Sequence, residues 1–134
     1  MQLLIDTSLW IDFTRARSPQ ALKQFIAPYI LDSDAVLAEP VAFEVLRYAT
    51  DQEVRQIVAQ FQTLPTLATP ADLWHTAAAF GQKCRKAGVN AGTMDLSIAV
   101  VAVRHNAEVI TFDADFQRIG RACGLSVKLL HRPG

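Results

Sequence analysis

The sequence has little cysteine, no excess of either charge and no long apolar run. The only two cysteines, Cys84 and Cys123, lack the spacing of a metal site, so we expect free, buried thiols in a reducing compartment. Lys plus Arg and Asp plus Glu each number 13, so only a local basic patch would bind nucleic acid. No apolar run approaches the ~20 residues that cross a bilayer, and Asp6 comes too early for a signal peptide. We therefore expect a cytoplasmic protein that does not enter a membrane.

The composition is typical of a folded protein. Hydrophobic residues make up 51% of the chain and charged residues 19%, while glycine and proline number six each. A chain of 134 residues fits one compact domain with a substantial core. We therefore expect residues 1–134 to form a single domain.

Short apolar stretches alternate with helical patterns along the chain. We expect strands within residues 2–5, 35–38, 63–70, 108–112 and 125–130. Helices are expected at residues 9–17, 19–30, 40–49, 51–62, 71–88, 94–105 and 114–119, and the helix at 94–105 is apolar enough to lie in the core. Ser18, Asp51 and Thr93 are the expected N-caps of three of these helices. The alternation predicts an α/β fold in three layers, with helices on both faces of a mostly parallel sheet of four to five strands.

Two aspartates follow predicted strands directly. Asp6 comes after the first strand, and Asp113 comes after the strand at 108–112. A single Asp in this position is usually a turn former or a helix cap. However, the carboxyl ends of parallel strands meet at one edge of the sheet, where ligands bind. We therefore expect both side chains at that edge.

Two further acids lie in predicted helices. Asp95 is in the first turn of its helix, where the helix dipole favours an acid, and Glu44 alone would be solvated surface. Together with Asp6 and Asp113 they form a set of four carboxylates that can converge. Converging carboxylates repel one another unless a cation binds or some are protonated. Mg²⁺ prefers such oxygen ligands, and no histidine neighbours these acids, so a zinc hydrolase is not expected.

Four segments together resemble a known family. They are LIDTSLWIDF, FEVLRYA, MDLSIAVVAV and VITFDADF, in this order and spacing. Their features are a strand-end Asp followed by Thr and Ser, a Glu-Leu-like helix, an Asp before an Ile-Ala helix, and Thr-x-Asp-x-Asp-Phe. Along essentially its whole length the chain is similar to the PIN-domain ribonucleases, and among them to the VapC-type toxins of type II toxin–antitoxin pairs.

The resemblance implies a PIN-like fold and a Mg²⁺-dependent endoribonuclease, with Mn²⁺ as a substitute. The reaction would be hydrolysis of an RNA phosphodiester by a metal-activated water, leaving a 5′-phosphate and a 3′-hydroxyl. The catalytic residues of the family fall on Asp6, Glu44, Asp95 and Asp113. The metal would be held by Asp6, Asp95 and Asp113, and Glu44 would orient or deprotonate the water.

Supporting residues also follow from the resemblance. Ser8 and Thr111 match the polar residues that support the family's site, and Asp115 is an additional acid that either holds a metal-bound water or, as we favour, caps the helix at 114–119. Glu39 is a rival for the glutamate. We prefer Glu44, because Glu39 precedes a proline and is expected to be extended.

RNA binding needs positive charge beside the acidic edge. The candidates lie at the end of the first expected helix or precede residues 89–92, and they are Arg15, Arg17, Lys83, Arg85 and Lys86. Single-stranded RNA is also read by stacking on aromatic side chains. Trp10 and Trp74 lie in apolar helical patterns, so we expect both in the core.

The resemblance implies three partners. They are an RNA substrate, with tRNA or rRNA favoured, a cognate antitoxin that places a peptide near the acids, and a second copy in a homodimer. The apolar helix faces within residues 12–30 and 51–62 exceed what a small core needs, and a partner helix would cover them.

Other classes of protein are also compatible with strand-end acids. A receiver-like signalling domain would bind Mg²⁺ at the same edge, but it would want paired acids after the first strand, where Thr7 and Ser8 follow Asp6. A haloacid-dehalogenase-like phosphatase would need Asp-x-Asp there. A noncatalytic PIN-like module that binds RNA or protein remains open, because only activity separates it from a nuclease.

Overall fold

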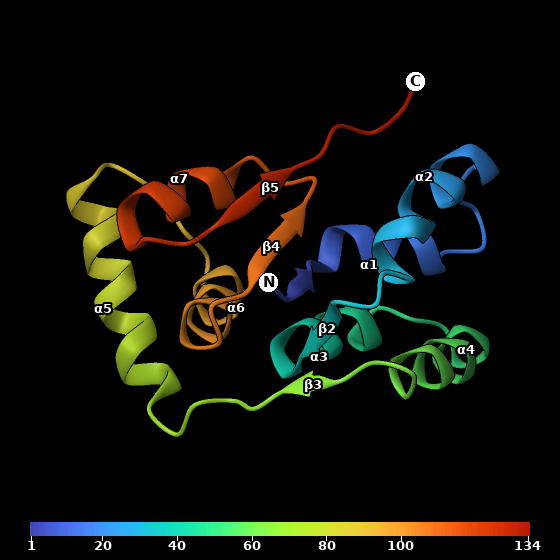
Figure 1. Ribbon diagram of the computed structural model, residues 1–134, viewed down its shortest axis with the longest axis horizontal. Coiled ribbons are helices and arrows are strands. Elements are labelled where there is room, and N and C mark those ends of the chain that lie inside the picture. The colour runs from blue at the N-terminus through green and yellow to red at the C-terminus, as the bar shows by residue number, and fades with distance from the viewer.

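The computed structural model describes all residues from 1 to 134 and contains one parallel sheet with seven helices (Figure 1). The strands are β1 (Leu3–Ile5), β2 (Ala35–Ala38), β3 (Thr66–Leu67), β4 (Glu108–Thr111) and β5 (Val127–Leu129). The helices are α1 (Thr7–Thr14), α2 (Gln20–Ile30), α3 (Glu39–Arg47), α4 (Asp51–Phe61), α5 (Leu73–Lys86), α6 (Thr93–Arg104) and α7 (Asp115–Cys123). No helix has the length and apolar character required to span a membrane.

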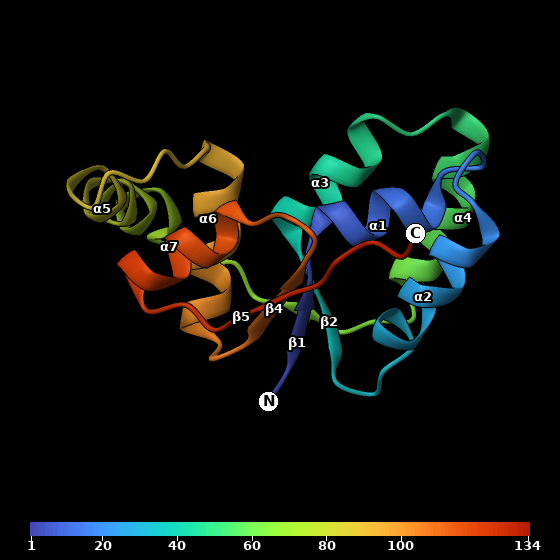
Figure 2. The ribbon, with the colours of Figure 1, turned by 90° about the horizontal axis from the view of Figure 1, so that it is seen from above.

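The sheet order is β3-β2-β1-β4-β5, and every neighbouring pair is parallel. Figure 2 shows α5, α6 and α7 on one side of the sheet and α1, α2 and α4 on the other. Helix α3 lies between the two groups and contacts α1, α4 and α6. This arrangement is the expected three-layer α/β/α fold, and it brings the segments after β1, β2 and β4 to one edge of the sheet.

The core is deepest around α6. Residues 98–102 of this helix are fully buried, which confirms that its apolar sequence places it in the interior. Trp10 is also fully buried and packs edge-on against Phe61, with ring centroids 4.9 Å apart. The expectation for Trp74 is wrong, because 63% of this residue is exposed at the start of α5. The helical face of α5 that enters the core is formed instead by Ala77, Phe80 and Cys84.

The cysteine thiols are free, as expected. Cys84 is buried in α5, while Cys123 at the end of α7 is only partly buried. The two sulfur atoms are 3.8 Å apart, so residues distant in the sequence pack α5 against α7. Burial, with the neighbouring Cys84 thiol, raises the pKa of Cys123 to about 11.

Two of the expected helix caps are wrong by one residue. The cap of α4 is Thr50 rather than Asp51, because Thr50 and Glu53 form a reciprocal pair. Glu53 N donates to Thr50 Oγ1 at 3.2 Å, and Thr50 N donates to Glu53 Oε1 at 2.9 Å. The sequence Thr-x-x-Glu has the signature of this capping box. The cap of α2 is Pro19 rather than Ser18, with no side-chain hydrogen bond.

The start of α6 also differs from the expectation. Gly92 occupies the cap position in an extended conformation, and Thr93 is the first helical residue. The carbonyl of Thr93 instead accepts a hydrogen bond from Ser97 Oγ at 2.9 Å. A glycine is an acceptable N-cap because it meets no steric cost there. Asp95 therefore stays in the first turn, as expected.

Candidate functional site

Asp6 is the buried anchor of the site. It caps α1 directly after β1 and is only 3% exposed. Its Oδ2 atom accepts hydrogen bonds from Thr111 Oγ1 at 2.8 Å, from Ser8 Oγ at 2.9 Å and from Ser8 N at 3.3 Å. Burial raises the pKa of Asp6, and these hydrogen bonds oppose the rise because they stabilise the carboxylate. Ser8 and Thr111 thus fix the position of one buried carboxylate.

The same two hydroxyl groups hold the turn after β4. Phe112 N donates to Ser8 Oγ at 3.1 Å, and Asp113 N donates to Thr111 Oγ1 at 2.9 Å. Each hydroxyl therefore accepts a hydrogen bond from a backbone amide of the turn and donates one to the Asp6 carboxylate. This chain of bonds fixes Asp113 relative to Asp6, although the two aspartates are far apart in the sequence.

Glu44 reaches the site from α3. Its Oε1 atom accepts a hydrogen bond from Thr7 Oγ1 at 2.8 Å, and Thr7 is the first residue of α1 after Asp6. The sequence indicated a role for Thr7, because a threonine follows the strand-end aspartate. It did not indicate that Glu44 is the hydrogen-bond partner of Thr7.

The rival Glu39 points elsewhere. Its carboxylate accepts a hydrogen bond from Thr69, in the loop after β3. The argument that Glu39 is extended is wrong, because it is the first residue of α3 and Pro40 is tolerated in the first turn. The preference for Glu44 is supported instead by the direction of the two side chains.

Asp95 shows that the acids converge. Its pKa is raised to about 7, first by burial and then by the negative charges of Asp6, Asp113, Glu44 and Asp115, in that order. Asp95 forms no salt bridge that would offset these effects. Carboxylates from the N-cap of α1, from α3 and α6, and from the segment after β4 and the start of α7 therefore share one electrostatic environment.

Asp115 is the outermost of these acids. It is the first residue of α7 and does not cap the helix, because Ala114 occupies the cap position. The expectation of a cap is therefore wrong. Asp115 N donates to Asp113 Oδ1 at 2.9 Å, and the Asp115 carboxylate pairs with Arg118 on the surface. The amide thus orients Asp113, while the carboxylate faces solvent.

The donor set fits a hard divalent cation. It consists of carboxylate oxygens alone, and no three His, Cys, Asp or Glu residues lie close enough together in this structure to hold a metal ion as a group. Mg²⁺ suits such an open arrangement, because it keeps several waters and takes only one or two carboxylates directly. A cation would also relieve the repulsion that raises the pKa of Asp95.

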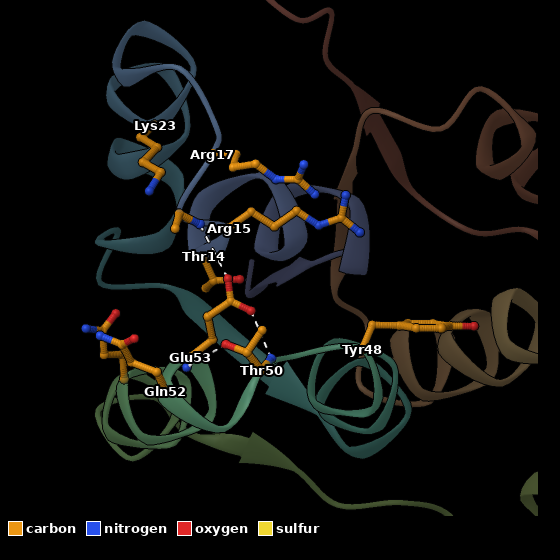
Figure 3. Close-up of a pocket in the computed structure, with 10 residues that line it drawn as sticks. Thr14, Arg15, Arg17, Lys23, Tyr48, Thr50, Gln52 and Glu53 are labelled. Carbon is orange, nitrogen blue, oxygen red and sulfur yellow. Dashed lines mark hydrogen bonds between the residues drawn. The ribbon is translucent and has the colours of Figure 1, made fainter.

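The five basic candidates fall into two places. Arg15 and Arg17 follow α1 and line a cleft of about 540 Å³ together with Lys23, which the sequence analysis missed (Figure 3). Lys83, Arg85 and Lys86 form the exposed last turn of α5, where positive charge complements the helix dipole. Neither group forms an ion pair with the acids.

Comparison with known proteins identifies the family of the chain. A model of the PIN domain matches residues 3–122. The curated relatives include VapC ribonuclease Mb1587 of Mycobacterium bovis and ribonuclease VapC11 of Mycobacterium tuberculosis. Each is 31% identical over 129 residues, which are 92% of this chain and 95% of the relative.

Solved structures show the same fold at low sequence identity. VapBC2 from Rickettsia felis, bound to a promoter DNA fragment, aligns with a TM-score of 0.73 at 15% identity and covers 97% of this chain and 99% of its own. VapBC-1 from nontypeable Haemophilus influenzae aligns with a TM-score of 0.72 at 22% identity. The alignment covers 96% of this chain and 98% of the VapBC-1 chain. The fold therefore agrees with that of these proteins along nearly the full chain.

Proposed function

This chain belongs to the PIN-domain family, among the VapC ribonucleases, and on that premise we propose that it is a metal-dependent endoribonuclease acting as the toxin of a toxin–antitoxin pair. The observation that carries the proposal is the convergence of carboxylates around Asp95, whose pKa rises to about 7. Retention of such a destabilising cluster indicates a functional site rather than a structural one.

The proposed metal ligands are Asp6, Asp95 and Asp113, with Mg²⁺ as the metal and Mn²⁺ as a substitute. When bound, the cation would lower the pKa of a water molecule and stabilise negative charge on the phosphate. The oxygen-only chemistry of these side chains and the negative charges that act on Asp95 support this assignment.

The residues of the chain have distinct proposed roles. Ser8 and Thr111 hold the Asp6 carboxylate in one orientation, and the amide of Asp115 does the same for Asp113. Glu44, held by Thr7, orients or deprotonates the attacking water. The expected products are a 5′-phosphate and a 3′-hydroxyl.

The proposed partners are an RNA substrate, with tRNA or rRNA favoured, a cognate antitoxin and a second copy of the chain. The antitoxin is supported by the fold shared with proteins solved as VapBC complexes. Exposed apolar residues on α4 and just after α2, Val58 and Leu31, support a covering partner.

The test is cleavage of a mixed tRNA and rRNA pool by the purified, antitoxin-free protein. Reactions contain Mg²⁺, Mn²⁺ or EDTA, with Asp95→Asn as the matched control. We expect discrete fragments that require metal and disappear in the variant. Metal-independent fragments, or equal cleavage by Asp95→Asn, would contradict the proposal. Absence of cleavage by a folded protein under every metal condition would favour the noncatalytic PIN-like module.

A further inference from the structure

A basic cleft lies at the C-terminal end of α1. One wall comes from Thr14, Arg15, Ala16 and Arg17, with Lys23 on α2, and the other comes from Tyr48 and the start of α4 (Figure 3). None of the three cations has an ion-pair partner within salt-bridge distance, whereas the cations that are paired in this protein, Arg104, Arg118 and Arg132, lie elsewhere. The cleft therefore offers unpaired positive charge to an anion.

Glu53 is the one acid in the cleft, and it holds the basic segment in place. Its Oε2 atom accepts a hydrogen bond from Ala16 N at 3.4 Å, between the two arginines, and its Oε1 atom accepts one from Thr50 N. These backbone bonds lower the pKa of Glu53, and the positive charge of Arg15 adds to the effect. The carboxylate is thus engaged with backbone donors on both oxygens, and it ties α4 to the segment that bears Arg15 and Arg17.

Two helices connect the cleft with the acidic site. Asp6 and Arg15 cap opposite ends of α1, which is about 12 Å long. Glu44 and Tyr48 are one helical turn apart on α3. A flexible chain bound at the acids therefore reaches the cleft within a few of its backbone units.

Two exposed aromatic side chains lie on α3 and at its C-terminal end. Phe43 is 55% exposed and Tyr48 is 66% exposed, and the Arg47 guanidinium lies over both rings, 5.5 Å and 4.7 Å from their centroids. Tyr48 also lines the cleft. Exposed aromatic faces beside a positively charged groove are the combination with which proteins bind single-stranded nucleic acids.

We propose that this cleft is the subsite for single-stranded RNA next to the scissile bond, with Arg15, Arg17 and Lys23 on its phosphates and Tyr48 stacked on a base. The inference rests on the proposed ribonuclease function. Cations placed here would compensate the repulsion that the acidic site exerts on a phosphate backbone. An acidic protein segment would find the same charge but would make no use of the aromatic faces.

The test measures binding of a short fluorescent single-stranded RNA of mixed sequence to full-length protein in EDTA, over a series of salt concentrations. Arg15→Gln/Arg17→Gln is compared with Arg55→Gln/Arg121→Gln, which removes the same charge from exposed positions outside the cleft. If each arginine neutralises one phosphate, the cleft variant should lower the log–log salt slope by ~1.4 and weaken binding about 10-fold at 0.15 M salt. The control variant should bind as the wild type does. Tyr48→Ala should weaken binding about 5-fold or more.

Cleavage kinetics separate this inference from the proposed function. Arg15→Gln/Arg17→Gln should raise KM and leave kcat unchanged, because these residues lie outside the acidic cluster. If wild-type protein cuts RNA and the cleft variant keeps the wild-type KM and salt slope, the cleft inference is overturned while the ribonuclease stands. Loss of polyglutamate binding by the cleft variant, with RNA binding unchanged, would overturn it in favour of an acidic protein segment.

Discussion

Replacing Asp95 by asparagine should stabilise the metal-free protein while abolishing cleavage. Burial and then the negative charges of four other acids raise the pKa of Asp95, and its side chain forms no salt bridge. The amide of asparagine therefore removes repulsion without breaking a contact. This pairing of a gain in stability with a loss of activity distinguishes a functional acid from a structural one.

The size of the effect follows from the pKa of Asp95. A carboxyl group whose pKa rises from 3.8 to about 7 on folding would lower the free energy of unfolding by ~4 kcal/mol at pH 8, if the full pKa difference counted toward stability. Asp95 is only partly buried, and solvent screening reduces this to about 1–2 kcal/mol. For a chain of this size we expect the melting temperature of Asp95→Asn to exceed that of the wild type by about 3–8 °C at pH 8.

The sign of the pH dependence follows from the same values. Below pH 4 the carboxyl group is protonated in both states, so wild type and variant should be equally stable. Between pH 4 and 7 the unfolded chain loses its proton first, and the wild type becomes progressively less stable than the variant. Above pH 7 both states are ionised, and the difference is constant.

The assay is thermal unfolding in EDTA at several pH values, repeated with Mg²⁺. Added Mg²⁺ should raise the melting temperature of the wild type, because it binds only the folded state, and should have a smaller effect on the variant. If Asp95→Asn melts below the wild type at pH 8, or if the difference persists unchanged at pH 4, the reasoning about clustered charge is wrong.

Three further outcomes are expected. Thr7→Val removes the hydrogen bond to Glu44, so kcat should fall while KM stays unchanged. The free energy of unfolding should fall by only ~1 kcal/mol. An unaltered kcat would show that Glu44 does not need this hydrogen bond. Thr111→Val takes a hydroxyl donor from the buried Asp6 carboxyl group and should cost about 2 kcal/mol in urea unfolding. An unchanged free energy of unfolding would show that this hydrogen bond does not stabilise the fold. Alkylation of Cys123 by iodoacetamide, followed by mass spectrometry, should be slow at pH 7. The alkylation rate should rise about 10-fold per pH unit toward pH 10, because the pKa of Cys123 is about 11. Rapid labelling at pH 7 would refute that value.

The fold and the acidic residues could be predicted because they depend on local pattern. Alternating apolar and amphipathic segments determine a parallel sheet, and the sheet brings Asp6 and Asp113 to one edge. Their placement needs no knowledge of side-chain contacts. The sequence therefore identified where to look for the site.

Details that depend on tertiary contacts were beyond the sequence. Trp74 lies in an apolar helical pattern but remains exposed, because Ala77 and Phe80 face the core instead. Lys23 joins Arg15 and Arg17 only because α2 folds back beside α1. The bond from Thr7 to Glu44 spans separate elements, and no local rule predicts it.

The burial of α6 also has a consequence for local opening of the structure. Amides of fully buried helices exchange with solvent only through global unfolding, whereas exposed connections open at little free-energy cost. Residues 98–102 are fully buried, while residues 15–17 are exposed. Asp95 thus stands at the start of the helix with the slowest expected hydrogen exchange, and the arginines of the cleft stand on a segment expected to exchange early. The chemistry would then have a rigid support, and the surface beside it would adapt to its ligand.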